Sequence, residues 1–223
     1  MNEGRSGKDP FHFYSRMLLP ELTGLRASDL GEMLSIIKNA EPSVIYHHTH
    51  RFIQQHQYLT PEPPNDFAFW ISGVLGEYKL GEKLESISTI DFPSIGALKD
   101  KIVSVIEQYV KSCPEALNRK AHPGEEFHFV KSVSFIFPTD YWAADLDEFA
   151  EALGKVAMSS IYFHMFEARL RLEKGNNDFS FWIGSSMGDT ELAGRISRLD
   201  PYTYTLEQLR EKIISMIKER KVN

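Results

Sequence analysis

The segment Asn177-Asp178-Phe179-Ser180-Phe181-Trp182-Ile183 (residues 177–183) nearly repeats an earlier segment of the same chain. Residues 65–71 read NDFAFWI where residues 177–183 read NDFSFWI, so one position in seven differs. Upstream, the triplet FHF at residues 11–13 recurs at residues 127–129. Matches in the same order, with gaps only where proline or glycine cluster, indicate a duplicated unit. We predict two tandem repeats, at residues 11–112 and 127–221, joined by a linker at 113–126.

Hydrophobic spacing within each repeat is typical of helices. In residues 28–39, apolar side chains recur at intervals of three, four and seven: Leu30, Met33, Leu34 and Ile37. The same reading gives about five helices per repeat. We therefore expect a mainly α fold, a pseudo-two-fold helical bundle packed as one globular unit. A short β element is expected at most at the FHF segments, where apolar and polar residues alternate.

Composition restricts the classes of function. The chain has 223 residues and a net charge of −6, and no basic stripe that would suit nucleic acid. A single cysteine, Cys113, excludes an internal disulfide and a thiolate zinc cluster. The sequence contains no run of 18 apolar residues, the length that would indicate a membrane-spanning helix. We expect a cytoplasmic protein without a nucleic-acid or membrane partner, and no cofactor is indicated.

Two histidines occupy equivalent places in the predicted repeats. His48 and His164 both fall in the apolar seam of a predicted helix, where an imidazole must find a hydrogen-bond partner. They are either hydrogen-bonded core residues that tie helices together or ligand contacts that line pockets. Both interpretations remain open from the sequence.

The carboxylates Asp66 and Asp178 open the helices that carry the NDF segments. Aspartate at a helix start usually caps the helix, but an aspartate beside tryptophan also suits sugars and other polar rings. The aromatic residues that follow are expected in the core: Phe67, Phe69, Trp70, Phe179, Phe181 and Trp182.

The second repeat adds a carboxylate. His164 and Glu167 stand three residues apart on one helical face, a spacing found in helix-borne metal sites. One histidine and one carboxylate are two ligands, and zinc requires at least three from the protein, so no metal site is predicted. Arg169 beside Glu167 belongs either to a solvated helix face or to a site for phosphate or carboxylate.

The second repeat also resembles a known family. The residues that carry the resemblance are SIYFH at 160–164, EARLR at 167–171 and NDF at 177–179. Together they resemble an uncharacterised "domain of unknown function" family of microbial proteins. The resemblance implies a carbohydrate or sugar-nucleotide context and supplies no catalytic residue. The first repeat departs from the pattern, with Arg51 in place of the glutamate, so we expect the second repeat to carry the better site.

The leading hypothesis is a non-enzymatic module that binds a small polar ligand, sugars included, or a partner protein. Its candidate binding residues are His48, Asp66, His164, Glu167, Arg169 and Asp178. One alternative is a hydrolase that uses His164 and Glu167 with a metal or as an acid–base pair. Another is a scaffold in which all of these residues are structural.

Overall fold

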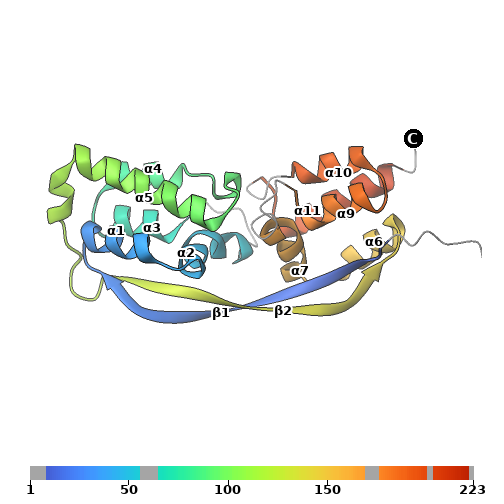
Figure 1. The fold of residues 1–223 in the computed structure, drawn as a ribbon, viewed down its shortest axis with the longest axis horizontal. Coiled ribbons are helices and arrows are strands. Elements are labelled where there is room, and N and C mark those ends of the chain that lie inside the picture. Colours follow the sequence, from blue (N-terminus) through green and yellow to red (C-terminus); the bar gives the residue numbers. More distant parts are fainter. Residues whose placement is uncertain (1–8, 56–64, 169–175, 200–202, 221–223) are drawn as a thin grey trace, which may run out of the picture. The chain divides into compact units, whose positions relative to one another are not determined.

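A computed structural model describes residues 9–55, 65–168, 176–199 and 203–220 (Figure 1). A long strand, β1 (Phe11–Ala27), comes first in the chain. It is followed by helices α1 (Leu30–Asn39), α2 (Pro42–Gln55), α3 (Asp66–Gly73), α4 (Tyr78–Glu85) and α5 (Ile95–Ser112). Short 3₁₀ turns lie at Thr89–Asp91 and Pro114–Asn118.

The second part of the chain repeats this order of elements. It begins with strand β2 (Phe127–Ala143). The helices after it are α6 (Leu146–Leu153), α7 (Met158–Tyr162), α9 (Asp178–Ser185), α10 (Thr190–Ser197) and α11 (Leu206–Glu219). A π-helical turn, Phe163–Glu167, continues α7.

The expectation of a mainly α bundle with at most a short β element is wrong. More than half of the described residues are helical, and β1 and β2 are each 17 residues long and form a two-stranded antiparallel sheet. Thr139 Oγ1 donates to the carbonyl of Phe13 and Thr23 Oγ1 to that of Phe129, at 2.8 and 2.7 Å. The second half of each strand is exposed on both faces and therefore lacks the alternation that predicts a strand.

The described residues form two compact units, and each unit combines parts of both predicted repeats. The N-terminal unit contains residues 18–55 and 65–134, with helices α1 to α5. The C-terminal unit contains residues 9–17, 135–168, 176–199 and 203–220, with the helices from α6 onward. Each strand therefore divides between the units, with its first half beside the helices of the other repeat. The repeat boundaries read from the sequence remain a prediction.

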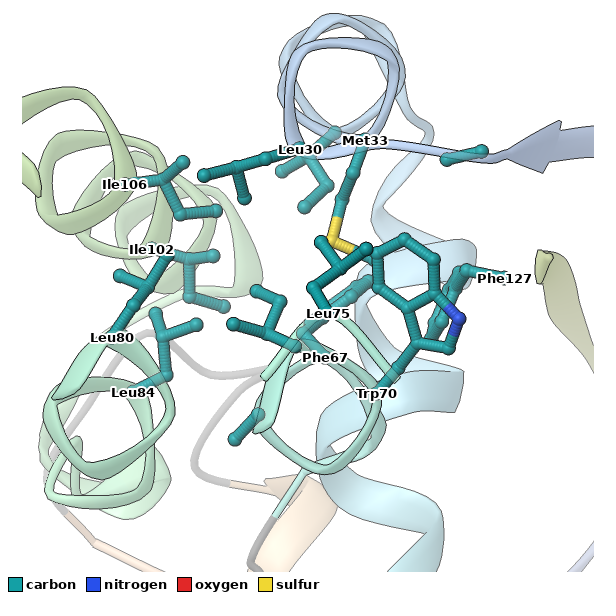
Figure 2. Packing of buried hydrophobic residues seen from close by; sticks show 14 of the residues in the cluster. Leu30, Met33, Phe67, Trp70, Leu75, Leu80, Leu84, Ile102, Ile106 and Phe127 are labelled. Atoms are coloured by element: carbon teal, nitrogen blue, oxygen red, sulfur yellow. The ribbon is translucent and has the colours of Figure 1, made fainter. Parts of the chain in front are cut away.

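The core of the N-terminal unit shows this exchange in detail. Figure 2 shows Phe127 of β2 beside Trp70 of α3, with ring centroids 5.8 Å apart. Phe67 also contacts Phe127, at 5.3 Å, and Phe129 is fully buried. Apolar side chains from the helices and from the turn after α3 complete the cluster: Leu30, Met33, Leu75, Leu80, Leu84, Ile102 and Ile106. Burial of these rings supplies much of the driving force for docking the strand.

The NDF helices are capped by asparagine, one residue before the expected aspartate. Asn65 Oδ1 accepts from the amide of Ala68 and Asn177 Oδ1 from the amide of Ser180, both at 2.8 Å. Both asparagines are buried, and their amide groups donate to carbonyls of the following helix. The capping role predicted for Asp66 and Asp178 therefore falls to their neighbours.

Candidate functional site

Each unit holds a buried histidine against an aspartate. Nδ1 of His48 lies 2.8 Å from Oδ2 of Asp66 in the N-terminal unit. Nδ1 of His164 lies 2.8 Å from Oδ2 of Asp178 in the C-terminal unit. Both histidine side chains are 4% exposed, whereas the aspartates differ, with Asp66 at 60% and Asp178 at 18%. The structure thus pairs four of the six candidate residues.

The other nitrogen of each ring accepts a hydrogen bond from a strand. The amide N–H of Tyr14 donates to Nε2 of His164 at 2.8 Å, and that of Val130 donates to Nε2 of His48 at 3.0 Å. A backbone amide can only donate, so Nε2 must be unprotonated and the proton of the neutral ring lies on Nδ1. Nδ1–H then donates to the aspartate. Each histidine therefore ties a helix to the strand segment of the other predicted repeat.

Aromatic rings surround these histidines in the same way in both units. In the C-terminal unit the centroids of Phe11 and Phe179 lie 4.9 and 5.4 Å from that of His164. In the N-terminal unit Phe127 and Phe67 lie 4.8 and 5.3 Å from His48. Such packing supports the interpretation of the histidines as hydrogen-bonded core residues.

A hollow of about 400 Å³ opens beside the His164–Asp178 pair. Its wall includes both side chains of that pair and residues from β1, β2 and α9: Phe11, His12, Tyr14, Ile136, Phe181 and Trp182. The indole N–H of Trp182 donates to the carbonyl of Asp9 at 2.8 Å, which fixes the ring within the wall. Tyr14 and Phe181 are 40% and 51% exposed.

Phe181 corrects an expectation from the sequence. Phe69 and Phe181 were both predicted in the core, but they are 64% and 51% exposed. The helical repeat contains the signal that was missed, because Phe179 and Ile183 lie one turn apart on the buried face and Phe181 stands between them. Tyr14, His12 and Ile136 were missed because they come from the strands, far from α9 in sequence.

Glu167 is buried, and its carboxylate forms an ion pair with the guanidinium of Arg16 from β1. The side chains of Glu167 and Arg16 are 7% and 9% exposed. Glu167 closes the π-helical turn that also contains His164, and such turns are frequent at functional sites. The ion pair nevertheless engages Glu167 with a strand residue, which disfavours an acid–base role beside His164.

The remaining predictions concern Arg169, metals and the membrane. Arg169 lies outside the described residues. Among the residues the structure describes, no group of three His, Cys, Asp or Glu side chains could hold a metal ion. Within the same residues, no helix combines the length and apolar character that a bilayer crossing requires.

The N-terminal unit has a different surface at the equivalent place. The spacing of the predicted repeats sets Val130 and Pro20 where the C-terminal unit has Tyr14 and Ile136. Phe127, Phe69 and Trp70 correspond there to Phe11, Phe181 and Trp182, so Tyr14 is the aromatic ring without a counterpart. Asp66 is also more exposed than Asp178. Two further histidines of α2, His47 and His50, are buried and contact the hydroxyls of Ser132 and Thr49 at 3.0 and 2.7 Å.

Comparison with known proteins agrees with the resemblance read from the second repeat. Residues 8–218 match the family of unknown function DUF5752. The chain belongs to this family. A solved structure described as "The structure of OrfY from Thermoproteus tenax" is 30% identical to the DUF5752 chain and superposes with a TM-score of 0.81. The alignment covers 97% of this chain and 98% of OrfY.

The match to OrfY supports the fold along nearly the whole DUF5752 chain, including the long strands. A comparison with curated proteins finds no match. Neither the family description nor the OrfY description states an activity, so function must be argued from the site itself.

Proposed function

We propose that this DUF5752 chain is a binding module whose C-terminal unit takes a small polar ring compound, such as a sugar, in the hollow beside Asp178. The observation that carries the proposal is the combination of exposed rings and a carboxylate around one cavity. Small-molecule sites are typically concave and mostly apolar, with a few polar groups that orient the ligand. The hollow of about 400 Å³ has this composition.

The contacts suggest a role for each wall residue. Tyr14 and Phe181 present ring faces on which the apolar face of a sugar can stack. Oδ2 of Asp178 already accepts a hydrogen bond from Nδ1–H of His164, and a carboxylate can accept further hydrogen bonds. A ligand hydroxyl donating to it would form a charge-assisted bond, which is stronger than a neutral one. His164 orients Asp178 without contacting the ligand.

The two alternatives read from the sequence are less well supported by this geometry. A hydrolase based on His164 and Glu167 needs a proton-accepting nitrogen, but Nε2 of His164 already accepts from the amide of Tyr14. A purely structural role suits His48, His164 and Glu167 well. It does not account for the exposed Phe181 beside a hollow that contains a carboxylate.

Thermal shift and titration calorimetry with monosaccharides, disaccharides, sugar phosphates and nucleotides test the proposal. We expect one class to bind saturably and to raise the melting temperature. Phe181→Ala should weaken that binding about tenfold or more, because a stacked ring contributes on the order of 1 kcal/mol or more. Phe181 is half-exposed, so the variant should fold normally.

Phe69→Ala is the matched control, since Phe69 holds the equivalent position in the N-terminal unit and is 64% exposed. Its binding should equal that of the wild type. If no compound in the panel binds, or if Phe69→Ala weakens binding as much as Phe181→Ala, this assignment of the site is wrong.

A further inference from the structure

Large apolar side chains are concentrated on the second half of β2. Phe135, Phe137, Tyr141 and Trp142 are 49%, 45%, 37% and 56% exposed. Met17 of β1 is 50% exposed. All five belong to the C-terminal unit, and none of them lines the hollow beside Asp178. We call these five residues the ribbon patch.

Strand geometry brings part of the ribbon patch together. The bond from Thr139 to the carbonyl of Phe13 fixes the antiparallel register, and counting four residues along each strand sets Met17 opposite Phe135. Side chains two apart on a strand lie on one face, so Phe137 joins them there. This places three large apolar side chains side by side on the two-stranded sheet.

The size of the ribbon patch approaches one half of a stable interface. Met17, Phe135, Phe137 and Tyr141 share one face of the two-stranded sheet, whereas Trp142 points to the other face. At these exposures the four side chains present roughly 360 Å² of apolar surface, taking about 200 Å² for each large side chain. A standard interface buries about 800 Å² per partner, of which about 57% is apolar. This face of the ribbon patch therefore offers about four fifths of the apolar area expected from one partner.

The charge distribution favours a second copy of the same chain. Residues 133–139 read VSFIFPT and contain no charged side chain. In a two-fold contact the same surface meets itself, so a charged patch would repel its own copy and an uncharged one would not. The core of an interface is also depleted of charge and enriched in aromatic residues, as this stretch is.

The prolines indicate how the copies would meet. Pro138 lies within β2 and Pro20 within β1, and a proline has no amide proton to donate to an added strand. Proline on an edge strand discourages strand addition. Contact through side chains is therefore favoured over extension of the sheet.

We propose that the ribbon patch is a self-association surface through which two copies of this chain form a homodimer. The expected contact packs Met17, Phe135 and Phe137 of one copy against the same surface of the other. It is independent of the ligand proposed for the hollow, which uses other residues.

Light scattering coupled to size exclusion, over a wide range of protein concentration, tests the proposal on the full chain. The wild type should shift from monomer to dimer as concentration rises. Phe137→Asp should weaken the dimer about tenfold or more, because it puts a charge at the centre of an apolar contact. Leu22→Asp is the matched control on β1, since Leu22 is 73% exposed and belongs to the N-terminal unit.

Hydrogen exchange of the wild type gives a second readout that needs no variant. Amides in residues 135–142 should exchange more slowly at dimeric concentrations than at monomeric ones, while those of α1 to α5 should not change. A wild type that stays monomeric at all concentrations would overturn the proposal. So would a dimer that Phe137→Asp and Leu22→Asp weaken equally, or one without slower exchange at residues 135–142.

Discussion

Single side chains in this protein stabilise the fold by joining segments that are distant in sequence. His164 accepts from Tyr14, 150 residues away, and His48 accepts from Val130, 82 residues away. The hydroxyl of Tyr109 at the end of α5 donates to the buried Glu77, which also pairs with Arg119. Removing one partner from such a network leaves the other buried without its hydrogen bond.

His164→Ala should lower the free energy of unfolding by about 1–3 kcal/mol, because Asp178 and the Tyr14 amide both lose a partner. Asp178→Asn should cost less, since an amide oxygen can still accept from Nδ1. Urea unfolding measures both, and the exposed His128→Ala serves as the control. If His164→Ala changes stability by less than about 0.5 kcal/mol, the structural role assigned to this histidine is wrong.

Tyr109 predicts a response to alkaline pH. The hydrogen bond to Glu77 and burial raise the pKa of Tyr109 well above its usual value. The folded state therefore holds this proton more tightly than the unfolded state, whose tyrosine ionises near pH 10. The resulting stability is fully present below about pH 10 and is lost as pH rises towards the folded-state pKa.

Tyr109→Phe provides the comparison for that response. The variant should be about 1 kcal/mol less stable than the wild type at neutral pH. The difference should shrink above about pH 10, where ionisation of Tyr109 favours the unfolded wild type. Urea unfolding of both proteins over this pH range provides the measurement. A difference that stays constant with pH would contradict the assignment.

Between helices, close packing depends on small residues that compensate one another. A Cβ added to Gly81 of α4 would overlap the hydroxyl of Ser72 on α3. The equivalent pair in the C-terminal unit is Gly184 on α9 and Ala193 on α10, so the glycine has moved to the other helix. There a Cβ added to Gly184 would meet the Ala193 methyl at 3.4 Å. Each helix pair thus contains one glycine at the contact.

Gly81→Ala should destabilise the protein by about 1–3 kcal/mol, because the added methyl overpacks the contact with Ser72. Ser72→Gly in the same chain should recover most of this loss, since the double variant reproduces the pair found in the C-terminal unit. A double-mutant cycle by chemical denaturation measures the coupling. Additive effects of the two substitutions would show that the helices do not meet in this way.

The whole chain is organised by exchange of strand halves between the predicted repeats. Phe13 belongs to the first repeat in sequence, yet its ring lies 5.3 Å from Phe149 and 6.1 Å from Phe179, both of the second repeat. Phe129 makes the reciprocal contact with Phe67 at 6.4 Å. Both phenylalanines are fully buried. Completion of each helical unit therefore requires residues from both halves of the chain.

Phe13→Ala should destabilise the C-terminal helices, and Phe129→Ala the N-terminal helices, each by about 3–5 kcal/mol for a deleted buried ring. Hydrogen exchange with mass spectrometry can assign the loss of protection to segments. Phe13→Ala should accelerate exchange in α6 and α9, and Phe129→Ala in α1 and α3. Faster exchange confined to the helices of the same repeat would contradict the exchange of strands.

The positions of the helices, and the need of His48 and His164 for hydrogen-bond partners, could be predicted from the local sequence pattern. The spacing of Leu30, Met33 and Ile37 predicted α1, and the apolar seam around His48 and His164 indicated a need for hydrogen-bond partners. The NDF repeat located α3 and α9, and the pattern left the cap open between the asparagine and the aspartate of that segment. These features could be predicted because they depend on neighbours within one or two helical turns.

The long strands, the hollow and the exposed ribbon patch could not be predicted in the same way. Residues 133–139 carry no alternation, since the strand there is exposed on both sides, and their pairing depends on a strand more than a hundred residues away. The amide of Tyr14 donates to His164 across a separation of 150 residues, which no local pattern records. The short-range periodicity of apolar residues predicts which face of a helix or strand is buried. Which other segment packs against that face depends on the tertiary structure of the complete chain.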